Sequence, residues 1–308
     1  MTEIDVIIPT TGTRLNQLNE CLNSLNKQTQ KVNVVIVLAS HNNQTLTQFK
    51  KQFPTFTILQ EPYKHLKGSH RAVACNFGLQ NTSNPIVAFL DDDVSVPSTW
   101  AESSLKYFKD PTVGGVTSGC TPYTSPFHRV QTIGSDAHSN TFTIPTTVES
   151  IPGYNSIYLR KIITLVGGFS ENIGGCEDWE LNYRIRNYGH YHLLGIPETP
   201  VEHRHTYTYK SFIKQMFGYG WSRSRLFRKS HIFTPQHSIP TIGSILLISL
   251  LCLNLELFVI VSGLYFSTLT YLTYRTKPSS PKSFFSTIFT FIIMHTSWAF
   301  GYLKGLIE

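Results

Sequence analysis

The chain has 308 residues, of which 41% are hydrophobic, and a formal charge of +7 at pH 7. This composition excludes a disordered chain, and the length predicts one large domain or one domain with an accessory part. The five cysteines are scattered without a Cys-x-x-Cys pair, which argues against a disulfide framework or a zinc site. The first residues show no basic segment followed by an apolar one, so we expect no signal peptide and reduced thiols in a cytoplasmic compartment.

The positive charge is concentrated in one part of the chain. Residues 1–203 carry 15 Lys and Arg against 17 Asp and Glu, whereas residues 204–255 carry seven basic residues and no acid. A basic block that leads directly into apolar sequence predicts contact with an anionic membrane surface. Because the preceding part is slightly acidic, we do not expect a nucleic-acid partner.

Short apolar runs alternate with helical periodicity in the first part of the chain. The runs predict buried strands at residues 5–9, 34–38, 56–59 and 86–90. The segments between them predict helices at residues 15–25, 46–52 and 70–79. This alternation predicts an α/β fold with a mixed, mainly parallel sheet and flanking helices.

The next part of the chain contains weaker signals. They predict a helix that starts near Trp100, a strand at 113–117, a long irregular loop over 121–150, a helix from 177 to about 187, and short strands at 190–194 and 200–205. Long loops in compact domains are often functional.

The apolar run at 86–90 ends in three consecutive carboxylates, Asp91, Asp92 and Asp93. Ligands of open α/β sheets bind just beyond the carboxyl ends of the strands. Three adjacent acids repel one another unless a cation or hydrogen-bond donors offset their charge. Since Mg²⁺ and Mn²⁺ prefer oxygen ligands and bind substrate phosphates, the stretch indicates a metal–diphosphate site. An acidic surface turn is the alternative interpretation.

A second group of acids follows a glycine-rich segment, residues 166–176, at the predicted start of a helix. Glu177, Asp178 and Glu180 fall in its first turn, where the helix dipole favours carboxylates. They are therefore either charge complements of the helix or a general base and acceptor-binding acids. His203 and His205, two residues apart on a predicted strand, point to one face and are candidates to share a ligand.

Taken together, these stretches resemble the family 2 glycosyltransferases, which have the GT-A fold, over roughly residues 4–205. The resemblance rests on Val6–Thr10, on Phe89–Asp93, on Val166–Phe169 leading to Glu177–Trp179, and then on Arg184, Gly189 and His203. Members of this family transfer a sugar from a nucleotide-sugar to an acceptor, usually with Mg²⁺ or Mn²⁺.

The resemblance implies a role for each matching residue. Asp93 and Asp91, with His203, would hold Mn²⁺ or Mg²⁺, and Asp178 would be the catalytic base with Glu177 as its partner. Contacts with the donor are implied for Pro9, Thr10, Thr11, Ser40, Arg71, Asp91 and Asp92, and contacts with the acceptor for Trp179 and Gly175. A carboxylate opposite the leaving diphosphate predicts a single displacement that inverts the anomeric centre.

The sequence departs from the family pattern at two places. The family usually has an acid at the end of the second strand, where this chain has Leu38, Ala39 and Ser40. The family also often has an Arg-Asn pair before the central strand, where this chain keeps Asn76 and has an arginine, Arg71, one turn earlier. Both departures concern recognition of the donor.

The last third of the chain predicts membrane helices. Residues 241–274 contain one charge, Glu256, and would be about 50 Å long as a single helix, longer than a hydrocarbon core of about 30 Å. We expect a helical hairpin, with one tilted span as the alternative. A third apolar segment, 283–303, would be a further span or an interfacial helix, and residues 206–238 a basic and aromatic interfacial helix with a linker. A soluble pair of core helices is the other alternative.

These observations predict a GT-A domain over residues 1–205, a linking region over 206–238 and a membrane region over 239–308. We expect a membrane-anchored, metal-dependent inverting glycosyltransferase that faces the cytoplasm, with a lipid-linked glycan intermediate as acceptor. The alternatives are a synthase that places a sugar on polyprenyl phosphate, a degenerate sugar- or nucleotide-binding module and, more weakly, a nucleotidyltransferase.

Overall fold

The computed structural model describes residues 4–39, 43–62, 70–121, 125–132, 142–189, 191–204 and 207–308. The chain divides into two compact units. The sheet unit comprises Met1–Thr121, Asp136–Asn172 and Glu177–His205, and the helical unit comprises Pro122–Ser135, Ile173–Cys176 and Thr206–Glu308.

Parallel strands form one half of the sheet. β1 (Ile4–Thr10) lies between β2 (Asn33–Leu38) and β4 (Ile86–Leu90), and β3 (Thr57–Gln60) continues the sheet beyond β2. All these pairings are parallel, and every residue of β4 is buried. A strand that is covered on both faces requires a continuous apolar run, which is the pattern that predicted it. The α/β fold class is confirmed.

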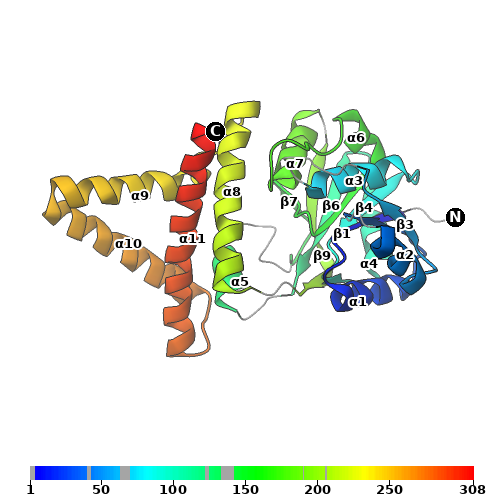
Figure 1. Ribbon diagram of the computed structural model, residues 1–308, viewed down its shortest axis with the longest axis horizontal. Coiled ribbons are helices and arrows are strands. Elements are labelled where there is room, and N and C mark those ends of the chain that lie inside the picture. The colour runs from blue at the N-terminus through cyan, green and yellow to red at the C-terminus, as the bar shows by residue number, and fades with distance from the viewer. Residues whose placement is uncertain are drawn as a thin grey trace. The chain divides into compact units, whose positions relative to one another are not determined.

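Helices cover both faces of this sheet (Figure 1). α3 (His70–Gln80), α6 (Arg160–Leu165) and α7 (Glu177–Asn187) pack on one face, where Phe89 and Tyr158 belong to the core. α1 (Leu15–Asn26) lies on the other side and buries its leucine stripe. The remaining helices of the unit are α2 (Asn43–Gln52), α4 (Trp100–Leu105) and a 3₁₀ turn, Lys106–Lys109.

The other half of the sheet is mixed. β8 (Asn155–Leu159), which the sequence did not predict, inserts antiparallel between β4 and β6 (Val113–Cys120). β9 (His192–His203) pairs in parallel with β6 and antiparallel with the short strands β7 (Thr146–Val148) and β5 (Val94–Ser95). Because β9 pairs with β5, the carboxyl end of β9 lies beside the residues that follow β4.

Two sequence predictions were wrong here. The expected pair of strands at 190–194 and 200–205 is the single strand β9, whose pairing with β6 shifts between Ser118 and Cys120. Thr199 has a φ of 56°, and the half-buried residues 197–200 interrupt the buried apolar positions although the strand continues. The expected loop over 121–150 contains α5 (Pro126–Thr132) and β7. Phe127 and Val130 of α5 pack in a core cluster of the helical unit, so tertiary contacts stabilise a helix with little local signal.

The helical unit is built on two long parallel helices, α8 (Tyr209–Ser230) and α11 (Pro281–Ile307). Small residues allow their backbones to approach closely. A Cβ added to Gly220 would lie 2.1 Å from the Trp298 carbonyl oxygen, and one added to Gly301 would lie 2.0 Å from that of Phe217. The N-terminus of α8 is closed by a capping box between Thr208 and Ser211.

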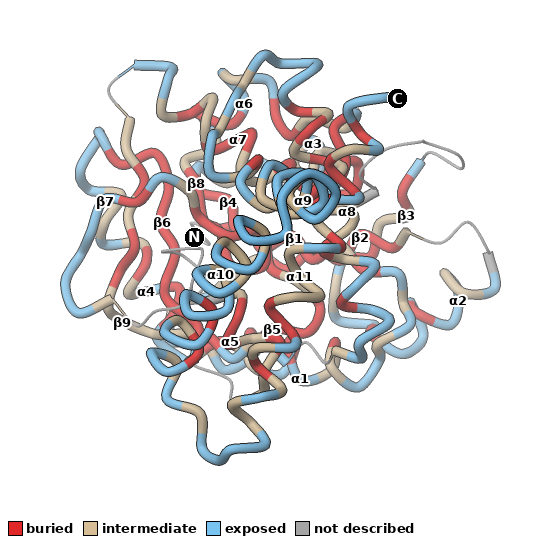
Figure 2. The backbone as a smooth tube through the Cα atoms, turned by 90° about the vertical axis from the view of Figure 1, so that its left-hand side faces the viewer, coloured by how far each residue is buried: buried red, intermediate tan, exposed pale blue. Residues whose placement is uncertain are grey.

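α9 (Pro235–Leu253) and α10 (Leu255–Arg275) form a hairpin that breaks at Asn254, whose side chain caps α10. Most of their residues are exposed or half-buried, pale blue or tan in Figure 2, and within these two helices only Ser238, Thr241, Leu269 and Thr273 are buried. Among the described residues, α9, α10 and α11 are long and apolar enough to cross a membrane. Exposed apolar surface of this extent is typical of membrane or protein interaction sites.

Candidate active site

The three aspartates follow β4 and point to different neighbours. Asp92 and Asp93 are buried, whereas the Asp91 side chain is 28% exposed. Thr10, the last residue of β1, donates a hydrogen bond of 2.5 Å from Oγ1 to Asp92 Oδ2. The two groups meet because β1 and β4 are parallel neighbours, whose carboxyl ends lie at the same edge of the sheet.

Arg14 binds both buried aspartates. Its Nη2 lies 2.5 Å from Asp92 Oδ1, and its Nη1 donates to Asp93 Oδ2. The turn before it contains Gly12, which has a φ of +77° and whose N–H donates to Thr10 Oγ1 at 3.0 Å. Burial raises the pKa of the Asp92 carboxyl above its usual value, while the Thr10 hydrogen bond and the Arg14 charge oppose that rise.

His203 reaches the same group of acids from β9. Its Nε2 lies 3.1 Å from Asp93 Oδ1 because the β5–β9 pairing sets His203 opposite Val94. Its ring stacks on Tyr154, with the ring centroids 4.5 Å apart. Asp91, Asp93 and His203 each offer a ligand atom, and these atoms lie within 4.8 Å of one another.

Arg71, on α3, connects these acids with the start of α7. Its Nε donates to Asp91 Oδ1 at 3.1 Å, and its Nη1 lies 3.7 Å from Glu177 Oε1. Its Nη2 donates to the Gly153 carbonyl oxygen, and the Gly153 N–H donates to Asp178 Oδ2 at 2.9 Å. Asp91, Arg71, Gly153, Glu177 and Asp178 therefore form one continuous polar network.

The acids at the start of α7 have different environments. Asp178 Oδ1 accepts from the Trp179 N–H at 2.7 Å, which is the local charge complementation that the helix terminus predicts. Its Oδ2 turns to Gly153 instead, so the side chain also belongs to the network around Arg71. Glu180 is buried and paired with Arg184 at 2.6 Å, and Arg184 also donates to the carbonyl oxygens of Val166 and Gly168. Glu180 and Arg184 therefore fix the glycine turn before α7.

The model of the family described as "Glycosyl transferase family 2" matches residues 5–166, more than half of the chain. This chain belongs to that family. It is also 31% identical over 176 residues to the pre-mycofactocin glycosyltransferase of Mycobacterium tuberculosis, a match that covers 55% of this chain and 36% of that protein. The chain thus matches little more than a third of the length of this curated relative. The family predicted from the sequence is confirmed.

Solved structures support the same fold. A mannosyltransferase from Pyrobaculum calidifontis, in complex with GDP-Man and Mn²⁺, superimposes with a TM-score of 0.62 at 17% identity, over 99% of this chain and 87% of that one. GalNAc-T7 with UDP, GalNAc and Mn²⁺ gives a TM-score of 0.50 at 13% identity, over 73% of this chain and 51% of that one. At these identities the likeness shows the GT-A fold alone.

The residues of this family member fit a divalent cation at the Asp91, Asp93 and His203 group. Two carboxylates and an imidazole are a donor set that suits Mn²⁺, and carboxylates alone also suit Mg²⁺. The charge around this group also favours a cation. Two guanidinium groups, those of Arg14 and Arg71, lie among five carboxylates, those of Asp91, Asp92, Asp93, Glu177 and Asp178.

The other predicted site residues make contacts outside the group formed by Asp91, Asp93 and His203. Thr11 hydrogen-bonds to Thr13 at 2.9 Å, and Pro9 lies within β1. Trp179 stacks on Tyr183 with ring centroids 5.7 Å apart. Gly175 belongs to the helical unit, where its N–H donates to Ser222 Oγ at 2.8 Å. Ser40 and His205 lie outside the described residues.

Sequence reasoning missed Arg14, Gly153 and Tyr154. A signal existed for Arg14, since a cation that closely follows the first strand of a parallel sheet falls at the edge where the aspartates were expected. Gly153 contributes only backbone groups, and Tyr154 precedes a strand that was not predicted. Neither of these two has a local pattern that would identify it.

Proposed function

We propose that this glycosyltransferase moves a sugar from a nucleotide-sugar donor to a hydroxyl acceptor in one displacement, with inversion at the anomeric carbon. The observation that carries the proposal is the polar network in which Arg71 and Gly153 join Asp91 to Asp178. It supports a site in which diphosphate-binding groups and a general base act on one substrate. The Pyrobaculum calidifontis mannosyltransferase, solved with GDP-Man and Mn²⁺, supports the donor class.

Asp178 is the proposed base. Its carboxylate takes the proton of the acceptor hydroxyl while the acceptor oxygen forms a bond to the anomeric carbon. The bond from that carbon to the diphosphate oxygen breaks, and the electron pair leaves with the nucleoside diphosphate. The N–H groups of Gly153 and Trp179 hold the carboxylate in place, at 2.9 and 2.7 Å.

Asp91, Asp93 and His203 would hold Mn²⁺ or Mg²⁺, which when bound supplies Lewis-acid stabilisation of the charge on the departing diphosphate. Arg71 is paired with Asp91 and Arg14 with Asp93, and both add fixed positive charge for the phosphate oxygens. Thr10 donates to the neighbouring Asp92 and so fixes that carboxylate rather than binding the cation.

We further propose that the enzyme is attached to a membrane through its C-terminal helices, with its catalytic part in the cytoplasm. Arg275 ends α10, Lys277 follows it and Lys282 lies in the first turn of α11, which agrees with the excess of cations in cytoplasmic segments. A lipid-linked glycan is then the acceptor class that such an enzyme meets at the bilayer.

The test is sugar transfer by the full chain in detergent or nanodiscs, with a panel of nucleotide-sugars and a lipid-linked glycan acceptor. We expect turnover with Mn²⁺ or Mg²⁺, loss of turnover in EDTA and in Asp93→Ala, and a product of inverted anomeric configuration by NMR. Full activity in EDTA, or retained configuration, would contradict the proposed mechanism. Labelling of polyprenyl phosphate alone would instead assign the enzyme to sugar transfer onto the lipid phosphate.

A further inference from the structure

The helical unit contains one helix that is too charged to cross a membrane. α8 carries six Lys and Arg and no acid over its 22 residues. The longest uncharged stretch in it lies between Lys214 and Arg223 and spans about 12 Å, against a hydrocarbon core of about 30 Å. α8 is also not one of the helices that are apolar enough to cross. Its place is therefore outside the hydrocarbon core.

α11 is apolar, but α8 accompanies it along most of its length. The ring of Tyr209 lies 5.6 Å from that of Phe289, and the ring of Tyr219 lies 6.4 Å from that of Trp298. Near the other end, Arg228 Nη1 donates to the Gly305 carbonyl oxygen at 3.2 Å. Because the two helices run side by side and in the same direction, α11 cannot cross the hydrocarbon core without taking the cations of α8 into it.

The exposed face of α11 suits the surface of a bilayer instead. Phe285, Phe289 and Phe300 are 69%, 53% and 68% exposed, and at 3.6 residues per turn they fall on one face. On α8, the cations Lys210, Lys214 and Arg228 also share a face. Aromatic rings at the acyl boundary, with cations next to phosphate groups, are typical of helices that lie in the plane of an anionic membrane.

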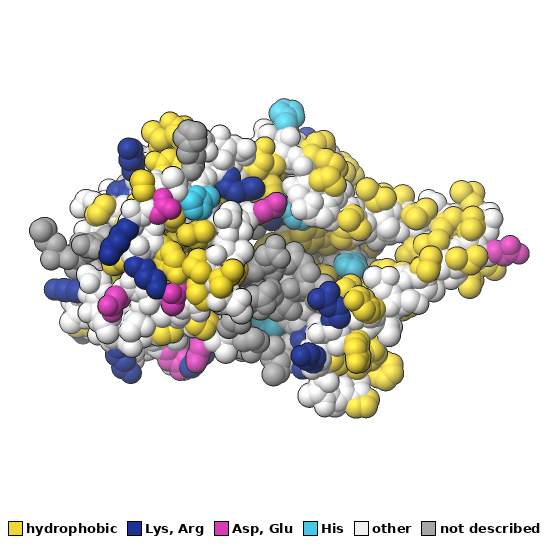
Figure 3. All heavy atoms as spheres, turned by 180° about the vertical axis from the view of Figure 1, so that it is seen from behind, with side chains coloured by type: hydrophobic (Ala, Val, Ile, Leu, Met, Phe, Trp, Pro, Cys, Tyr) yellow, Lys and Arg dark blue, Asp and Glu magenta, His cyan; other side chains and the backbone are white. Residues whose placement is uncertain are grey.

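The α9–α10 hairpin has the opposite character. α9 has no charged residue, and α10 has only Glu256 near its start and Arg275 at its end. The hairpin leaves the α8–α11 pair sideways, and its two arms meet at a tip (Figure 1). Hydrophobic side chains cover this arm in Figure 3, with an acidic side chain at the tip. It is the part of the helical unit that suits the bilayer interior.

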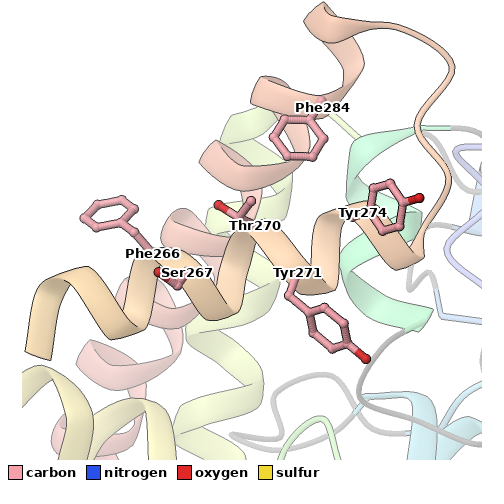
Figure 4. A pocket seen from close by; sticks show the side chains of 6 residues that line it. All are labelled: Phe266, Ser267, Thr270, Tyr271, Tyr274 and Phe284. Atoms are coloured by element: carbon pink, nitrogen blue, oxygen red, sulfur yellow. The ribbon is translucent and has the colours of Figure 1, made fainter.

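The base of the hairpin has the composition of a membrane boundary. An open groove of about 500 Å³ lies there, lined by Phe266, Ser267, Thr270, Tyr271 and Tyr274 of α10 and by Phe284 of α11 (Figure 4). Tyrosine is enriched at the boundary between lipid and water because its ring is apolar and its hydroxyl is polar. The cations Arg275, Lys277 and Lys282 follow Tyr274 within eight residues, where lipid phosphates would lie.

We propose that α8 and α11 lie together along the surface of an anionic phospholipid bilayer, and that only the α9–α10 hairpin enters it. α11 is then an interfacial helix, although it is long and apolar enough to span. This inference rests on the membrane attachment proposed above but not on the sugar-transfer chemistry.

The test is the membrane sidedness of single cysteines in the full chain, reconstituted in sealed vesicles that contain anionic lipid. Cys252, the exposed native cysteine, is replaced by serine, and the other four cysteines are buried. Ser279→Cys reports the segment between α10 and α11, and Glu308→Cys reports the end of α11. We expect a membrane-impermeant maleimide to label both from the same side. Labelling from opposite sides would show that α11 crosses and would overturn the inference.

Protein that has not inserted into the bilayer would also be labelled from one side, so the depth of spin labels in the bilayer is measured as well. Spin labels are placed at Phe285→Cys and Thr296→Cys, which share the exposed face of α11, and at Leu264→Cys in the middle of α10. We expect equal, shallow depths at 285 and 296 and a greater depth at 264. A label at 296 that is as deep as the one at 264 would overturn the inference, and so would a water-exposed label at 264. Sugar transfer is assayed on the same samples, so loss of activity with this topology would count against the proposed function only.

Discussion

Arg71 Nε donates to Asp91 Oδ1 at 3.1 Å, and the same guanidinium lies 3.7 Å from Glu177 Oε1. Arg71 thus connects acids that are far apart in the sequence, one after β4 and one at the start of α7. Its Nη2 also donates to Gly153, whose N–H holds Asp178. The position of Asp178 relative to Asp91 therefore depends on one side chain from a third element, α3.

Replacement of Arg71 tests that dependence. We expect Arg71→Gln to lower kcat/KM by about 10²–10³-fold, the effect of removing one preorganised electrostatic donor. Arg71→Lys should retain more activity, because it keeps the charge but loses the planar set of donors. Steady-state kinetics with both substrates provide the measurement. Lys106→Gln, which removes an exposed pair with Glu198, is the control and should be unchanged.

Arg14 opposes cation binding in the absence of substrate, since it neutralises Asp92 and Asp93 directly. We expect Arg14→Gln to tighten Mn²⁺ binding by about 10-fold, because two neighbouring carboxylates then lack their counter-charge. The same change should weaken binding of a nucleoside diphosphate, which loses a cationic neighbour. Electron paramagnetic resonance of free Mn²⁺ measures the first effect, and calorimetry measures the second.

Weaker Mn²⁺ binding in Arg14→Gln would contradict this prediction and would make Arg14 a support for the metal site rather than a competitor. His203→Ala is a useful comparison, since it removes a candidate ligand and should weaken Mn²⁺ binding. The two substitutions therefore act in opposite directions on the same equilibrium. Lys106→Gln again controls for the loss of a cation elsewhere on the sheet unit.

The parallel half of the sheet was predictable from the sequence because its strands are buried on both faces and have few polar interruptions. The site was predictable where a strand end fixed its position, as for Asp91, or where family resemblance singled out a residue, as for His203. The resemblance did not predict that the β5–β9 pairing brings His203 Nε2 to within 3.1 Å of Asp93 Oδ1, because this contact joins segments that are far apart in the sequence.

The missed features depend on contacts between distant segments. β8 contains Asn155 and Tyr158, whose side chains find their hydrogen-bond partners only in the folded structure. Asn155 accepts from the Trp100 indole at 3.1 Å, and the Tyr158 hydroxyl donates to Asn182 at 2.9 Å. A local pattern of hydrophobicity contains none of this information, because such polar positions resemble a loop until their partners are known.

Asp178→Asn tests the proposed base. The asparagine has nearly the same shape and keeps one acceptor oxygen for the N–H of Gly153 or Trp179, but it cannot take a proton. We expect kcat to fall by about 10²–10⁴-fold with little change in donor affinity. Asp110→Asn, which alters an exposed aspartate bound to Thr112, is the matched control. An unchanged kcat in Asp178→Asn would exclude this residue as the base.

The close approach of α8 and α11 predicts opposite effects for two neighbouring glycines. A Cβ at Gly220 would lie 2.1 Å from the Trp298 carbonyl oxygen, whereas a Cβ at Gly218 meets nothing within 4 Å. We expect Gly220→Ala to lower the free energy of unfolding by about 2 kcal/mol, because the helices must separate. Gly218→Ala should raise it by up to about 1 kcal/mol, since alanine is the better helix former. Thermal unfolding in detergent, followed by circular dichroism, measures both. Equal effects of the two substitutions would show that the helices are not packed at Gly220.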